Sequence, residues 1–149
     1  MRLDKKLIKA EKSSDRLRYL LIIGILVLAF SLSFMIRVQP LEYGFELNEF
    51  DPFFNYRATE FIVENGLPAY LEWHDDLSWH PYGRDVSATS QVMLHTTAAT
   101  LYQIFGMGSS LYDFAIWFPV VIGSLTTIVI FAIVRTIGGT TAGLFASLF

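Results

Sequence analysis

The chain has 149 residues, of which 53% are hydrophobic and 15% aromatic, and its mean hydropathy is +0.44. The apolar residues are concentrated in long runs, which argues against a soluble domain and favours a membrane protein. There is no cysteine, so disulfides, thiolate metal sites and a cysteine nucleophile are excluded. The net charge of −3 is a sum of segregated charges, and this segregation indicates membrane topology rather than nucleic-acid binding.

The N-terminal part reads as a basic arm followed by a membrane span. Residues 1–18 hold seven Lys and Arg against three Asp and Glu, whereas residues 19–36 carry no charge. A helix of about 20 residues crosses the hydrocarbon core, so residues 19–36 are predicted to be the first transmembrane helix. A cleaved signal peptide is the alternative, but the run is long and lacks a small-residue cleavage pattern. The basic flank places residues 1–18 in the cytoplasm.

Residues 37–112 are then predicted to form a long external loop carrying short surface helices. Asp51 before Pro52 is typical of a helix start, with Asp51 as N-cap, and this helix is expected over residues 52–65. Gly66 suits the position after its end. A second interpretation makes Asp51 a ligand of a hard divalent cation, and the two interpretations are compatible. The helix cannot span, so we expect it to lie along the membrane surface.

The rest of the loop contains two further candidate sites. Residues 69–87 are expected to be loop-like, and their His74-Asp75-Asp76 run is interpreted as a solvated acidic turn in preference to a metal site. Residues 88–105 are predicted to form one helix that is too polar for an easy span. His95 on this helix could be a ligand or a base, but a hydrogen-bonded packing role is favoured.

Residues 113–135 are predicted to be the second transmembrane helix, since residues 114–134 carry no charge. If residues 88–105 do not cross, this helix returns the chain to the cytoplasm, as Arg135 favours. After a glycine-rich turn, residues 140–149 are expected to begin a third transmembrane helix that is cut off in its middle.

Two ordered motifs in the loop resemble one family. The run from Glu49 to Thr59, Glu-Phe-Asp-Pro-Phe-Phe-Asn-Tyr-Arg-Ala-Thr, is similar to the first external loop of the oligosaccharyltransferase catalytic subunit. Residues 79–84, Trp-His-Pro-Tyr-Gly-Arg, resemble the family's Trp-Tyr-Pro-Leu-Gly-Arg, with departures at His80 and Tyr82. The resemblance covers the chain from the first predicted span onward.

This resemblance implies an all-α membrane protein, the N-terminal part of a polytopic, GT-C-like glycosyltransferase. It implies that Asp51 is a catalytic residue that binds Mg²⁺ or Mn²⁺. The implied partners are a lipid-linked oligosaccharide with a phosphate or pyrophosphate and a polypeptide with an Asn-x-Ser/Thr sequon. Further acidic ligands would lie beyond residue 149, so these residues alone are expected to be inactive. An archaeal plasma membrane is preferred over the endoplasmic reticulum.

Some alternatives stay open from the residues alone. The guanidinium of Arg84 could bind the donor phosphate through its planar fork, or it could pair structurally with a nearby acid. The whole chain could instead be a non-enzymatic membrane subunit in which Asp51 is only a helix cap. It could also be another transferase that uses a lipid-phosphate sugar with a different acceptor. The glycan, the lipid carrier and the metal preference do not follow from the sequence.

Overall fold

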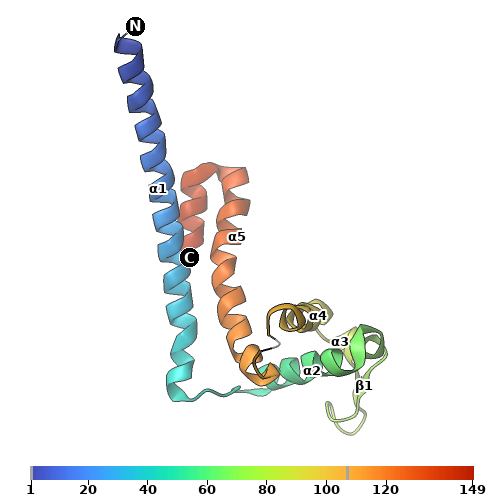
Figure 1. Cartoon of the computed structure of the whole chain (residues 1–149). Coiled ribbons are helices and arrows are strands. Elements are labelled where there is room, and N and C mark those ends of the chain that lie inside the picture. Colours follow the sequence, from blue (N-terminus) through green and yellow to red (C-terminus); the bar gives the residue numbers. More distant parts are fainter. Residues whose placement is uncertain (1, 107) are drawn as a thin grey trace. The chain divides into compact units, whose positions relative to one another are not determined.

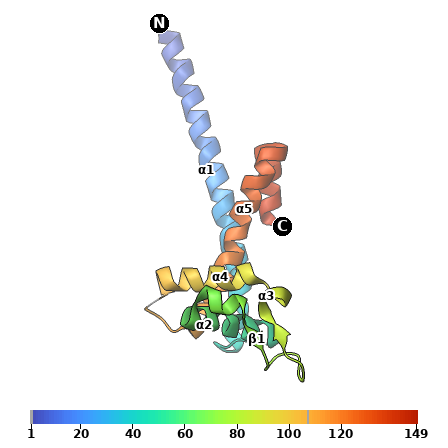
Figure 2. The same ribbon diagram turned by 90° about the vertical axis from the view of Figure 1, so that its right-hand side faces the viewer.

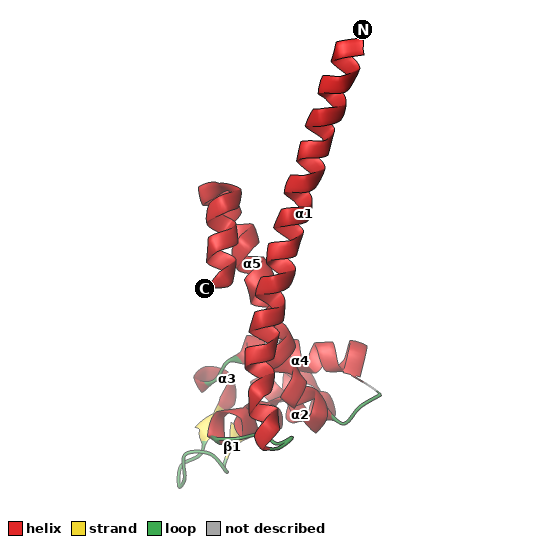
Figure 3. Cartoon of the chain, turned by 90° about the vertical axis from the view of Figure 1, so that its left-hand side faces the viewer, coloured by secondary structure: helices red, strands yellow, loops and turns green. Residues whose placement is uncertain are grey.

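The computed structural model describes residues 2–106 and 108–149, with side chains from Asp15 onward. The described part is almost entirely helical, and its only strands are the two-residue β1 (His74–Asp75) and β2 (Arg84–Asp85) (Figure 3). The predicted all-α class is therefore confirmed. The chain divides into two compact units, one formed by residues up to 42 together with residues 120–149, and the other by residues 43–119.

In the first unit, α1 (Arg2–Val38) is one continuous helix that is followed by the short 3₁₀-helix η1 (Gln39–Tyr43) (Figure 1). The basic N-terminal residues thus continue the helix of the apolar run. The stretch Asp15–Tyr43 has a mean hydropathy of 2.6, and only 6% of its most apolar window is buried. Length and composition make it able to cross a membrane, and its apolar surface is left uncovered by protein.

Helix α5 (Leu111–Leu148) is the second helix that is long and apolar enough to cross a membrane, with a mean hydropathy of 2.3. Its helical geometry is interrupted at Gly139, where φ is 81°, and the last turns fold back along the preceding ones (Figure 1). The returning segment packs closely, since a Cβ added at Gly143 would lie 2.9 Å from the carbonyl oxygen of Phe131. Small residues permit such close backbone approach between apolar helices.

In the second unit, α2 (Phe50–Leu71) is interrupted at Gly66, the residue at which the sequence predicts the helix to end. Gly66 has φ 83°, a left-handed value that glycine adopts without the steric cost of a Cβ. The chain then resumes a helical path with Pro68 in its first turn, where the missing N–H of proline costs nothing. Residues 69–87 are therefore not simply a loop, because they begin in this helix and continue into an antiparallel hairpin of β1 and β2.

The single helix predicted over residues 88–105 is divided in the structure. It comprises α3 (Val86–Thr89), α4 (Val92–Leu101) and the π-helix η2 (Tyr102–Gly106). Between α3 and α4, Ser90 is extended, with φ −129° and ψ 179°. Its hydroxyl donates a hydrogen bond of 2.6 Å to the carbonyl oxygen of Val86. Serine hydroxyls compete in this way with the helical backbone, and the helix breaks there.

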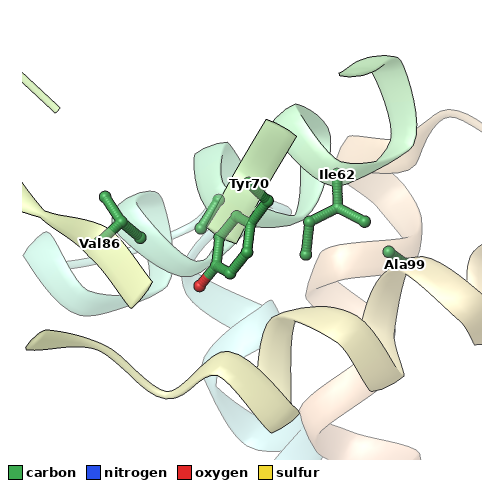
Figure 4. Packing of buried hydrophobic residues seen from close by; sticks show 5 residues of the cluster. Ile62, Tyr70, Val86 and Ala99 are labelled. Atoms are coloured by element: carbon green, nitrogen blue, oxygen red, sulfur yellow. The ribbon is translucent and has the colours of Figure 1, made fainter. Parts of the chain in front are cut away.

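The core of this unit lies where α2 and α4 pack side by side (Figure 2). Figure 4 shows its apolar cluster, in which Ile62 and Tyr70 of α2 meet Val86 of α3 and Ala99 of α4, and Ala58 is the fifth member. Phe61 also packs against the cluster and stacks on Trp73 with ring centroids 4.3 Å apart. An aromatic pair of this kind contributes about 0.5–1.5 kcal/mol beyond the area it buries. This core fixes the start of α2 relative to the hairpin.

Candidate active site on the loop unit

An open groove of about 870 Å³ lies between the first turns of α2 and the segment that joins β1 to β2. Its walls contain acidic, basic and aromatic side chains from both motifs that the sequence analysis singled out. The residues are Glu49, Phe50, Asp51, Phe53, Phe54, Tyr56, Arg57, Glu60, Leu77, Ser78, Trp79 and Arg84. The fold thus brings together two segments that are some 20 residues apart in sequence, and both predicted site residues, Asp51 and Arg84, line the same groove.

Asp51 lies in the first turn of α2 but is not its cap. The helix begins at Phe50, and Glu49 occupies the N-cap position with φ 74° and no side-chain capping bond. The prediction that Asp51 is the N-cap is therefore wrong by two positions, because the chain enters the helix through the left-handed conformation of Glu49. The Asp51 side chain is exposed and makes no hydrogen bond or ion pair to any described residue. Its carboxylate is available to a ligand, and the helix N-terminus favours its negative charge.

Arg84 is held by aromatic rings. Its guanidinium carbon lies 3.7 Å from the ring centroid of Phe54 and 5.1 Å from that of Trp79. No carboxylate of the described residues pairs with it, and its buried Nε–H has no hydrogen-bond partner there. Rings on a guanidinium are attractive by cation–π interaction, worth roughly 0.5–2 kcal/mol each, and this interaction does not use the N–H donors. The structural pairing with an acid, one of the two alternatives for Arg84, is not found.

The acidic turn after α2 is anchored by a buried carboxylate. Asp75 is 2% exposed and forms an ion pair with Arg57 of α2. It also accepts hydrogen bonds from the Leu77 amide at 3.1 Å and from the Ser78 hydroxyl. Burial opposes the charged form, but the bonds from Ser78, Arg57 and the Leu77 amide outweigh it and hold the pKa of Asp75 below its usual value. The prediction of a solvated turn is thus wrong for Asp75, although its neighbour Asp76 is exposed.

His74 of β1 is hydrogen-bonded to the second half of the hairpin. Its Nδ1 lies 2.7 Å from a carboxylate oxygen of Asp85, and its Nε2 lies 3.1 Å from the carbonyl oxygen of Tyr82. Both neighbours are acceptors, so the pair of bonds is complete only when both nitrogens carry a proton. The hydrogen bond to Asp85 and then that to Tyr82 raise the pKa of His74 above 6.5.

His95 lies in the core, as the favoured interpretation predicts. Its side chain is fully buried, with Nδ1 2.6 Å from the Tyr70 hydroxyl and Nε2 2.9 Å from Oδ1 of Asn55. Burial, and secondarily the charge of Arg84, lower the pKa of His95 to about 4. It is therefore a neutral, hydrogen-bonded packing residue at neutral pH and has no open coordination position.

A complete metal site is not present in the described part of the chain, where no three His, Asp or Glu side chains are grouped to hold an ion. A hard divalent cation takes six or more oxygen ligands. Asp51, exposed and unpaired, fits the role of one such ligand, and the remaining ligands would have to come from elsewhere.

Sequence reasoning missed the residues that hold the groove in shape. Phe54 and Trp79 were noticed as aromatic residues of the motifs, but not as the two faces that clamp Arg84. The Arg57–Asp75 pair and the Asn55–His95 bond also join residues far apart in sequence. Composition was the only signal for these contacts. It shows that each of the three bases has several acids as candidate partners, but it does not show which of them pair.

Comparison of the sequence with known proteins identifies the family of this chain. The family model described as oligosaccharyl transferase STT3, N-terminal, matches residues 20–149. The dolichyl-diphosphooligosaccharide–protein glycosyltransferase subunit STT3B of Oryza sativa subsp. japonica is 33% identical over 132 residues, which are 86% of this chain and 18% of that protein. Subunit STT3B of Arabidopsis thaliana is 43% identical over 84 residues, 56% of this chain and 11% of that protein.

Subunit STT3 of Saccharomyces cerevisiae is 31% identical over 105 residues, 68% of this chain and 15% of that protein. The chain thus spans less than a fifth of the length of these relatives. Two of its helices are long and apolar enough to cross a membrane, in agreement with the all-α membrane class predicted from the sequence. The chain belongs to the oligosaccharyl transferase STT3 family and corresponds to its N-terminal region.

Proposed function

We propose that the chain is the N-terminal part of the catalytic subunit of a membrane oligosaccharyltransferase. The complete protein would move a glycan from a lipid-phosphate or lipid-pyrophosphate donor to the side-chain amide of Asn in an Asn-x-Ser/Thr sequon. The observation that carries the proposal is that Asp51 and Arg84, from separate motifs, line one groove. An unpaired carboxylate and an unpaired guanidinium that line one groove would suit a metal-bound phosphate.

Asp51 would give one oxygen ligand to Mg²⁺ or Mn²⁺. When bound, the ion would stabilise the negative charge that develops on the leaving phosphate. The other oxygen ligands would come from water, the donor and segments of the longer protein, so residues 1–149 by themselves would not catalyse transfer. The backbone of Asp51 lies in the first turn of α2, so a metal ion would find this ligand at a defined place in the groove.

Arg84 would bind the donor phosphate. The rings of Phe54 and Trp79 would restrict the guanidinium without using its N–H donors. A planar fork of this kind matches two phosphate oxygens. Because the rings hold the arginine before the donor arrives, little side-chain entropy is lost on binding.

The position of the groove in the chain suits a lipid-anchored donor. The loop unit is connected at both ends to helices able to span the membrane, so it would lie near the membrane surface, where the donor phosphate also lies. Residues 37–112 would be external and the N-terminus cytoplasmic, as the basic flank favours. The relatives described above come from plants and yeast and lend no support to an archaeal plasma membrane over the endoplasmic reticulum.

The test uses the full-length protein in lipid nanodiscs, a lipid-linked oligosaccharide and a sequon peptide. Asp51→Asn keeps the shape of the side chain but removes its charge, and we expect kcat/KM to fall on the order of 10²-fold. The half-activating Mn²⁺ concentration should rise as well. Asp76→Asn is the matched control, because Asp76 is 89% exposed and does not line the groove. Near-normal turnover of a folded Asp51→Asn variant would refute the metal role.

A further inference from the structure

His95 does not line the groove, but it contacts the part of α2 that does. It projects from α4 and is fully buried, and it meets two consecutive residues of α2. Its Nε2 lies 2.9 Å from Oδ1 of Asn55, and its ring meets that of Phe54 edge to face with centroids 5.6 Å apart. On the far side its Nδ1 lies 2.6 Å from the hydroxyl of Tyr70. The single imidazole thus joins α4 to both ends of α2.

The hydrogen bonds use both nitrogens of a neutral ring. The amide oxygen of Asn55 only accepts, so Nε2 carries the proton and donates it, and Nδ1 accepts from the Tyr70 hydroxyl. Burial and the nearby charge of Arg84 keep the pKa of His95 at about 4, so the ring stays neutral at physiological pH. A neutral ring avoids placing a second positive charge beside Arg84.

The two residues that His95 fixes bear directly on the groove. Phe54 lines it, and its ring lies 3.7 Å from the guanidinium carbon of Arg84. Asn55 lies four residues after Asp51, one helical turn further along the same helix. A shift of the α2 backbone at Asn55 would therefore move both the ring under Arg84 and the turn that carries Asp51.

We propose that His95 is a positioning residue of the groove, which holds Asn55 and Phe54 of α2 so that Phe54 supports the Arg84 guanidinium. His95 contacts neither metal nor donor. The role rests on the proposed function, because it is the donor phosphate that Arg84 would bind. Its first consequence, order at the start of α2, is independent of any activity and can be measured separately.

The experiment compares His95→Leu and His95→Gln in the full-length protein in nanodiscs. Leucine fills much of the space but removes the hydrogen-bond partner of the Asn55 amide oxygen and leaves the Tyr70 hydroxyl only its contact with the Ser90 hydroxyl, whereas glutamine has both a donor and an acceptor. We expect His95→Leu to raise the KM for the lipid-linked donor about tenfold, the equivalent of one lost hydrogen bond, with kcat within about twofold. His95→Gln should recover most of this loss.

Hydrogen–deuterium exchange of the amides in residues 51–57 supplies the second readout. His95→Leu should accelerate their exchange about tenfold, and His95→Gln should not. Ala99→Gly is the matched control, because it weakens the same helix and core but removes no side-chain hydrogen bond to Asn55 or Tyr70. It should change exchange over the whole unit without a selective effect on residues 51–57, and it should leave the donor KM within about twofold.

The outcomes separate the two proposals. If the wild-type protein shows no transfer, the proposed function fails, and exchange at residues 51–57 still decides whether His95 orders α2. If His95→Leu leaves both the exchange and the donor KM unchanged, His95 only fills space and the inference is overturned. If His95→Leu fails to fold, equal exchange and KM values for His95→Gln and wild type support the hydrogen-bonding role. Tenfold changes in His95→Gln would overturn it.

Discussion

Neutralising Asp75 should release the segment that carries Trp79 over Arg84. Asp75→Asn removes the ion pair with Arg57 but keeps an oxygen that can accept from the Leu77 amide. Breaking a fully buried pair costs about 3–5 kcal/mol, whereas a surface pair is worth about 0–1 kcal/mol. Asp75 is 2% exposed but Arg57 is 34% exposed and can turn to water. We therefore expect a local loss of about 2 kcal/mol, between these limits.

The assay is hydrogen–deuterium exchange of the amides of residues 75–79 in the full-length protein. A loss of about 2 kcal/mol predicts roughly thirtyfold faster exchange. The control Asp76→Asn changes the neighbouring, exposed carboxylate and should leave these rates within about twofold. Equal rates for Asp75→Asn and wild type would refute the claim that the ion pair anchors the segment.

The sign of the pH effect follows from the depressed pKa of Asp75. A carboxyl with a lowered pKa in the folded state contributes stability above its unfolded pKa of about 3.9, and that stability is lost as pH falls through the lower folded value. The anchor of the segment should therefore be insensitive to pH between 5 and 8 as far as Asp75 is concerned. Wild type and Asp75→Asn should differ by the same factor across this range.

Two further predictions concern the hairpin. The pKa of His74 is raised, so its contribution to stability is complete below pH 6.5 and is lost as pH rises through the folded pKa. The hairpin should therefore loosen at alkaline pH, and an imidazole titration by NMR should give a pKa above 6.5. His74→Phe should abolish this pH dependence. Gly83→Ala should cost about 1–3 kcal/mol locally, because Gly83 has φ 70° and an added Cβ would clash with the His74 ring and lie 3.0 Å from the Asp75 carbonyl oxygen. Hairpin exchange rates like those of wild type would contradict it.

Charge-free runs in the sequence are sufficient to predict the two long helices, α1 and α5. The helix predicted over residues 52–65 is also present, and Ala58 and Ile62, one helical turn apart on it, are buried in the cluster that Figure 4 shows. Burial repeats with the turn of the helix, so a local pattern carries this information. The break at Ser90 was not predicted, because it depends on a side-chain hydrogen bond to Val86 and not on the apolar pattern.

The sequence could not show which acidic and basic side chains pair with one another. The run His74-Asp75-Asp76 is predicted to be a solvated acidic turn, yet Asp75 is buried and pairs with Arg57, 18 residues earlier on α2. Whether a carboxylate is solvated or buried depends on which base the fold brings to it, and that is a property of tertiary packing. Adjacent residues in one turn point in different directions, so Asp76 is exposed while Asp75 is not.

The partners of Arg84 are also decided by tertiary packing. The loop holds ten acids and three bases, so chance alone would favour a carboxylate partner for every arginine. Instead Arg57 pairs with the buried Asp75, and the guanidinium of Arg84 lies over the rings of Phe54 and Trp79. A structural arginine in an acidic loop would gain most from a carboxylate, and a guanidinium that is kept on aromatic faces retains its hydrogen-bonding edge for an anion from outside the chain. The proposed binding of the donor phosphate by Arg84 therefore depends on its having no acidic partner among the described residues.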